Sequence, residues 1–176
     1  MKLETERLIL RPWRPEDLEP FALMSADAEV MRWLGGVITR EQAVVYVART
    51  ELSFSTLGMG RFAIERRADR AFIGSCGLMP GHEGIPIAPY VDIGWRLARS
   101  AWGRGFATEA ALAVMGDGFG RLGLREIAAV TAQINLRSRA VMERLGMTRD
   151  RRHDFGDPAY PLRHAQRRTV VYRAHC

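Results

Sequence analysis

The spacing of hydrophobic residues along the chain changes several times between alternation and helical periodicity. These changes separate the expected strands from the expected helices. The segment 3–11 alternates between apolar and polar residues, which predicts a strand. Residues 16–25 and 28–34 place apolar side chains at helical spacing instead. Thr39, with Gln42 three positions later, matches a capping box and begins a longer predicted helix. Its expected core-facing stripe is Val44, Val47, Ala48 and Leu52.

The middle of the chain is rich in strand patterns. Residues 61–65 and 71–79 predict two antiparallel strands, and 90–97 predicts a third after the Gly/Pro-rich loop 80–89. Gly94 lies inside that third strand, where glycine weakens the strand, so it indicates a bulge or a close backbone approach.

Helix and strand patterns alternate in the last third of the chain. Residues 107–121 predict a helix, and the apolar segment 127–133 suits a buried parallel strand. Asn135 is placed to cap a short helix over 138–145. The longer helix should turn Leu112, Met115, Phe119 and Leu122 inward, and 148–154 and 169–173 read as closing strands.

This order of elements predicts one α+β domain over residues 1–176, because no repeat or low-complexity linker divides the chain. The strand 90–97, the helix 107–121 and the strand 127–133 form a right-handed βαβ unit with parallel strands. Ligands of such units lie beyond the carboxyl ends of the strands. The turn 102–108 and Asn135 are both expected at that end.

Composition narrows the class of protein further. The chain has 176 residues, 47% hydrophobic and 26% charged, and no apolar run approaches the roughly 20 residues that a membrane span needs. Cys76 and Cys176 are expected to be free thiols, which favours a cytoplasmic protein. The net charge of +6 favours anionic partners, but the arginines are scattered and form no nucleic-acid module. The four histidines lack metal-ligand spacing, so we expect no metal.

The most informative segment is the glycine turn at 102–110. Gly103 and Gly105 join a predicted strand to the start of a predicted helix. Such a turn leaves backbone N–H groups pointing outward at a helix N-terminus, where they and the helix dipole attract anions. Thr108 stands where a dinucleotide fingerprint has its third glycine, and no Gly-Lys-Ser/Thr follows, so neither a Rossmann nor a Walker loop is present.

Residues 103–110, Gly-Arg-Gly-Phe-Ala-Thr-Glu-Ala, resemble the acetyl-CoA-binding motif of the GCN5-related N-acetyltransferases (GNAT). The form that begins at Trp102 is similar to the branch that acetylates the N-termini of ribosomal proteins. Four further stretches agree with that branch in order and spacing: Thr5–Arg11, Ile93–Trp95, Asn135–Ser138 and Val141–Met147. One departure is Ser100, where the family has a polar Gln or Arg, although Arg99 stands beside it.

The resemblance covers residues 3–173 and implies the GNAT fold. That fold is a mixed, mostly antiparallel sheet of about seven strands with a central splayed parallel pair, flanked by about four helices. It also implies where acetyl-CoA binds. The N–H groups of Gly103, Arg104, Gly105, Phe106, Ala107 and Thr108 would bind its pyrophosphate, the backbone of Trp95, Arg96 and Leu97 its pantetheine arm, and Asn135 the arm's other side.

The implied chemistry is direct transfer of acetyl to a primary amine. Ser138 matches a serine that would protonate the leaving thiolate, although a serine in the first turn of a helix also serves as a capping residue. Asp92 is the candidate base, with a salt bridge to an arginine as the alternative. Glu109, in the first turn of the helix, is expected to stabilise that helix or fix the loop.

The resemblance places a protein N-terminal amine first among acceptors. A polyamine, an amino acid or an aminoglycoside is the alternative, and so is a binding module that holds acyl-CoA without turnover. We expect no membrane partner and no nucleic-acid partner, and a homodimer is left open.

Overall fold

A sheet of nine strands forms the centre of the computed structural model, which describes residues 1–176. The strands pair in the order β1-β2-β3-β4-β5-β6-β9-β7, and β8 also pairs with β9. Every pairing is antiparallel except that of β5 with β6. The strands are β1 (Leu3–Glu4), β2 (Leu8–Arg11), β3 (Arg61–Arg66), β4 (Phe72–Pro80), β5 (Val91–Leu97), β6 (Glu126–Ala132), β7 (Thr148–Arg149), β8 (Phe155–Gly156) and β9 (Arg168–His175).

Five α-helices accompany the sheet, with three short 3₁₀ turns between elements. The expected mixed sheet with its parallel pair is confirmed. The strands exceed the expected number because the predicted strand 3–11 is two antiparallel strands, β1 and β2, and because β8 lies in a segment expected to be a loop. The predicted strand 148–154 is wrong beyond Arg149, since residues 151–153 form a 3₁₀ turn. The helices are α1 (Leu18–Ser25), α2 (Ala28–Met31), α3 (Arg40–Leu57), α4 (Phe106–Gly120) and α5 (Leu136–Arg144).

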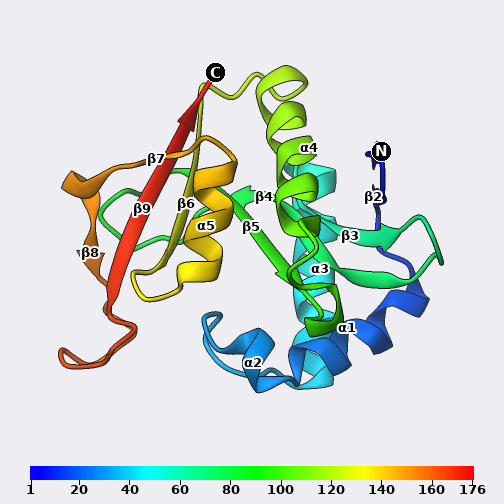
Figure 1. Cartoon of the computed structure of the whole chain (residues 1–176), viewed down its shortest axis with the longest axis horizontal. Coiled ribbons are helices and arrows are strands. Elements are labelled where there is room, and N and C mark those ends of the chain that lie inside the picture. Colours follow the sequence, from blue (N-terminus) through cyan, green and yellow to red (C-terminus); the bar gives the residue numbers. More distant parts are fainter.

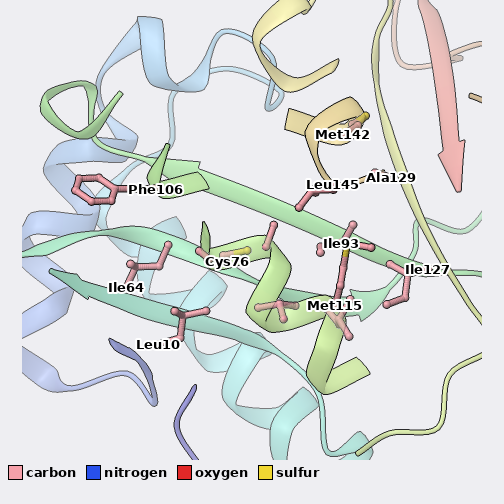
Figure 2. Packing of buried hydrophobic residues seen from close by; sticks show 14 of the residues in the cluster. Leu10, Ile64, Cys76, Ile93, Phe106, Met115, Ile127, Ala129, Met142 and Leu145 are labelled. Carbon is pink, nitrogen blue, oxygen red and sulfur yellow. The ribbon is translucent and has the colours of Figure 1, made fainter. Parts of the chain in front are cut away.

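The helices cover both faces of the sheet, and Figure 1 shows α4 and α5 in front of β4, β5 and β6. Two apolar clusters fill the two interfaces. Phe62 and Ile64 of β3 belong to the cluster under α4 and α5, whereas Ala63 between them belongs to the cluster with α1 and α3. Figure 2 shows Met115 of α4 and Met142 of α5 among side chains of the first cluster. Successive side chains of β3 therefore point into the two apolar clusters on opposite faces of the sheet.

The expected inward stripe of α3 is wrong at three of its four positions. Val44, Ala48 and Leu52 are exposed, whereas Ala43 and Thr50 face the core. Leu112 of α4 is likewise exposed, with Ala111 and Val114 buried in its place. Small residues, Ala43 of α3 and Ala110 and Ala111 of α4, face inward at these positions, where the helices pack closely on the sheet.

Buried charges join β2 to β3 and to the segment before α1. The Arg11 guanidinium donates to Asp17 at 2.6 Å and to Glu65 at 2.7 Å, and all three side chains are less than a tenth exposed. Asp17 also accepts the backbone N–H of Arg14 at 2.8 Å. The network fixes the chain that leads from β2 into α1.

The parallel strands β5 and β6 touch at one end and then separate. Their pairing is recorded only where Asp92 lies opposite Ala128. Beyond that point β5 continues to Leu97 beside β4, and Figure 1 shows β6 diverging from it. From residue 93 to 97, therefore, one backbone edge of β5 has no partner strand.

Candidate acetyl-CoA site

The glycine turn adopts a conformation that requires its glycines. Gly103 has φ 71° and Gly105 has φ 79°, both in the left-handed region that side chains disfavour. Gly105 is the N-cap residue of α4. A Cβ at Gly103 would meet nothing within 4 Å, and one at Gly105 would meet only the Arg7 guanidinium, at 3.4 Å. Backbone conformation, and not crowding, is the reason for both glycines.

This turn leaves a row of backbone donors free. No backbone hydrogen bond uses the N–H groups of residues 103–108, and the first in sequence is donated by Glu109 to the Gly105 carbonyl, at 3.0 Å. The residues Gly103, Arg104 and Gly105 are exposed. Phe106 buries its ring in the core while its N–H stays at the start of the helix. Free N–H groups and the positive end of the α4 dipole favour an anion at this position.

A carboxylate from α4 fixes the turn to the N-terminal segment. Glu109 accepts hydrogen bonds from the Thr5 hydroxyl at 2.6 Å and from the Arg7 backbone at 2.9 Å. The Arg7 guanidinium pairs with Glu109 at 2.6 Å and donates to the Arg104 carbonyl at 3.0 Å. Burial opposes ionisation of Glu109, but these hydrogen bonds outweigh it and lower its pKa. The expectation that Glu109 fixes the loop is confirmed, and the contact explains why the motifs at 5–7 and 108–110 occur together.

The unpartnered edge of β5 contains Trp95, Arg96 and Leu97. These residues pair with Cys76, Ser75 and Gly74 of β4 on their other edge. The Leu97 carbonyl already accepts the Trp102 indole N–H at 2.8 Å. An extended amide-bearing chain would complete such an edge as an added strand does.

Asn135 and Ser138 lie at the start of α5, the helix that follows β6. The Asn135 side chain accepts the Ser138 backbone N–H at 3.3 Å and donates to the Thr131 hydroxyl at 2.9 Å. Its expected capping role is therefore confirmed. The Ser138 hydroxyl makes no hydrogen bond within the protein and is partly exposed. It is free to donate to a bound group.

Asp92 forms the ion pair that the alternative interpretation predicts. Its Oδ2 lies 2.5 Å from Nη2 of Arg61, and both side chains are largely buried. Burial raises the pKa of Asp92, and the positive charge of Arg61 opposes that rise. Only Oδ2 takes part in the pair, so Oδ1 stays available to a proton donor.

Gly94 explains how Arg61 reaches this carboxylate. A Cβ at Gly94 would lie 2.0 Å from a guanidinium nitrogen of Arg61. The expected close approach is confirmed, although a side chain makes it and not another backbone.

Two arginines near the opening were not expected from the sequence to have side-chain roles. Arg137 of α5 stacks its guanidinium on the Trp102 ring, with 4.5 Å to the ring centre. The Arg96 side chain points to the opposite face of the sheet and stacks on Tyr46 at 4.9 Å. Nothing in the local sequence separates these from the many solvated arginines of the chain. No group of three or more His, Cys, Asp or Glu side chains is arranged to hold a metal ion.

Comparisons with known proteins identify the family of this chain. The family model described as an acetyltransferase (GNAT) domain matches residues 7–148. The uncharacterized N-acetyltransferase YoaA of Bacillus subtilis is 30% identical over 150 residues, which cover 84% of this chain and 83% of YoaA. A crystal structure of an acetyltransferase from Agrobacterium tumefaciens superposes with a TM-score of 0.81 at 28% identity, covering 100% of this chain and 95% of that one.

A more distant structure shares the fold alone. RimL, a ribosomal L7/L12 alpha-N-protein acetyltransferase solved in complex with coenzyme A, superposes with a TM-score of 0.81 at 17% identity, covering 99% of this chain and 98% of RimL. The chain thus belongs to the GNAT acetyltransferase family, and it is an acetyl-CoA-dependent N-acetyltransferase. No helix in the structure combines the length and apolar character that a membrane crossing requires.

Proposed function

We propose that this enzyme binds the diphosphate of acetyl-CoA on the N–H groups of residues 103–108 and the pantetheine arm along the open edge of β5. The observation that carries the proposal is the row of unused amide donors at the N-terminus of α4. The separation of β5 from β6 after Asp92 supports the second part, because it leaves the backbone of Trp95, Arg96 and Leu97 without a partner on that side. Asn135 would contact the arm from α5.

When bound, acetyl-CoA supplies an activated acetyl thioester. A neutral primary amine attacks its carbonyl carbon, so that an N–C bond forms and the C–S bond breaks. Backbone N–H groups of the open edge stabilise the charge that develops on the carbonyl oxygen. Asp92 accepts the proton that the amine loses, directly or through water, and later releases it to solvent. Ser138 donates its hydroxyl proton to the departing thiolate and regains a proton from solvent.

Burial helps Asp92 in this role because it raises the pKa of the carboxyl toward neutral pH. The pair with Arg61 limits that rise and holds the carboxylate in place. For Ser138, the support is a partly exposed hydroxyl with no competing partner at the start of α5.

We propose a protein or peptide N-terminal amine as the acceptor, because RimL shares the fold over nearly the whole chain. A small-molecule amine is the second candidate. It is favoured by a relative from Aspergillus fumigatus, named FsC-acetyl coenzyme A-N(2)-transacetylase, that is 31% identical over 157 residues.

A substrate panel tests these proposals. Release of free thiol from acetyl-CoA is measured with short peptides, the same peptides with blocked N-termini, polyamines, amino acids and aminoglycosides. Turnover confined to peptides with free N-termini would support the first acceptor. Turnover on small amines alone would favour the second. Stabilisation by acetyl-CoA with no turnover on any amine would contradict the proposed transfer.

A further inference from the structure

Arg96 holds a charge that no group in the protein neutralises. One terminal nitrogen, Nη1, donates to the Ser25 hydroxyl at 3.0 Å. Its Nε is buried and has no hydrogen-bond partner. Withdrawal from water lowers the pKa of the guanidinium, and no carboxylate of the chain compensates.

The residues around Arg96 hold its guanidinium in a defined position. The guanidinium stacks on Phe21 of α1, with 5.3 Å to the ring centre, and on Tyr46 of α3 at 4.9 Å. Phe21 and Ser25 are fully buried, so the groups that hold Arg96 are themselves fixed. Aromatic faces orient a guanidinium while leaving its N–H edge free to donate.

Two acids that are close in sequence to Arg96 or to its partner Ser25 pair with other arginines. Asp92 is paired with Arg61, and Asp27 is paired with Arg99 at 2.9 Å and caps α2. Arg61 adds a second positive charge nearby, which disfavours the charged form of Arg96 further. An unpaired, partly buried charge is costly to a folded protein, and such groups concentrate at binding sites.

Arg96 also lies on the same face of the sheet as the proposed base. Residues 92, 94 and 96 alternate away from Ile93, Trp95 and Leu97, which pack in the cluster under α4. Four residues of strand place the Arg96 Cα about 13 Å from that of Asp92. An acceptor that brings its amine to Asp92 therefore lies within reach of the Arg96 side chain.

We infer that Arg96 binds a carboxylate of the acceptor, so that the enzyme selects primary amines that also carry a carboxylate, such as a peptide with an acidic residue near its N-terminus. This inference rests on the proposed acetyl transfer and adds the chemical class of its acceptor. A carboxylate would supply the missing counter-charge and accept from the free N–H groups of the guanidinium.

Matched acceptors test this inference. The pairs differ only in charge: peptides with Glu or Gln at the second or third position, and amino acids with a free or amidated carboxyl group. We expect the wild-type kcat/KM to favour the carboxylate member by about ten- to a hundredfold, as a charge-assisted hydrogen bond predicts. In Arg96→Met the preference should vanish through a higher KM for the carboxylate member, and Arg96→Lys should retain part of it. Arg49→Met, an exposed arginine of α3, is the matched control and should keep the full preference.

Melting temperature gives a readout that does not depend on turnover. Because Arg96→Met removes an unpaired charge, the variant without ligand should melt higher than the wild type, and carboxylate-bearing peptides should stabilise the wild type but not the variant. A lower melting temperature together with an unchanged acceptor preference would show a structural role and overturn the inference. Equal wild-type rates on both members of every pair would overturn it while leaving acetyl transfer intact. If no amine were acetylated, the proposed function would fail, and stabilisation by carboxylates would still decide the role of Arg96.

Discussion

Single residues in this enzyme often combine a structural bond with a free functional group. Asn135 caps α5 through its side chain, and the bond it accepts comes from the backbone of Ser138 and not from the Ser138 hydroxyl. Asp92 uses one oxygen for Arg61 and leaves the other open. At this scale, the alternatives considered from the sequence are compatible roles of one side chain.

Replacement of Ser138 by alanine separates these roles. The variant keeps the capped helix, because the cap uses the backbone N–H. If Ser138 protonates the thiolate, kcat should fall about a hundredfold while the KM for acetyl-CoA changes little. Steady-state kinetics measure both constants, with Ser55→Ala on the exposed face of α3 as the matched control. An unchanged kcat would remove Ser138 from the proton transfer.

At the scale of elements, the start of α4 and one edge of β5 are left without backbone hydrogen-bond partners. The helix α4 begins at a glycine in the left-handed region, so no side chain of its N-cap residue takes up the free N–H groups. Glu109 and Arg7 hold that helix start against the N-terminal segment. The edge of β5 is open because β6 diverges after one pairing.

Gly105→Glu tests the start of α4. A carboxylate there would repel a diphosphate and occupy its position, so the Kd for coenzyme A should rise about a hundredfold or more, a loss of about 2.8 kcal/mol. Titration calorimetry measures this. Gly123→Glu is the matched control, because Gly123 has φ 65°, has open space around it and follows the other end of the same helix. Unchanged affinity in Gly105→Glu would refute binding at this turn.

At the scale of the whole molecule, the proposed coenzyme site draws on segments that are distant in sequence. Its proposed parts are the turn at 103–108, the edge of β5 and the start of α5, and the edge is open because the two parallel strands diverge. Unfolding would separate these parts, so a ligand that binds all of them stabilises the folded chain as a unit.

Coenzyme A should therefore raise the stability of the whole domain. At a hundred times its Kd, we expect the free energy of unfolding to rise by about 2.7 kcal/mol. For a chain of this size, that corresponds to a melting temperature about 5–10 °C higher. Differential scanning calorimetry measures the shift, with Gly105→Glu as the variant that should lose it. No shift at saturating coenzyme A would contradict a site made from all three segments.

Much of this architecture could be predicted from the sequence because its signals are local. Left-handed glycines, the capping residues Thr39 and Asn135, and strand alternation at Leu8 and Leu10 depend on neighbours within a few positions. The stripe predicted for α3 was wrong because small residues at Ala43 and Thr50 pack against the sheet, and close packing is a property of two elements, not of one.

The sequence by itself thus determined the order of the longer helices and strands, the glycine turn and the family, since short-range periodicity and motif spacing record them. Tertiary structure alone decided which side of each helix faces the sheet, that Asp92 pairs with Arg61, and that Arg96 is left without a counter-charge among Phe21, Ser25 and Tyr46. The physical reason is that ionic and stacking contacts act between side chains tens of residues apart, and only the folded chain brings them within reach.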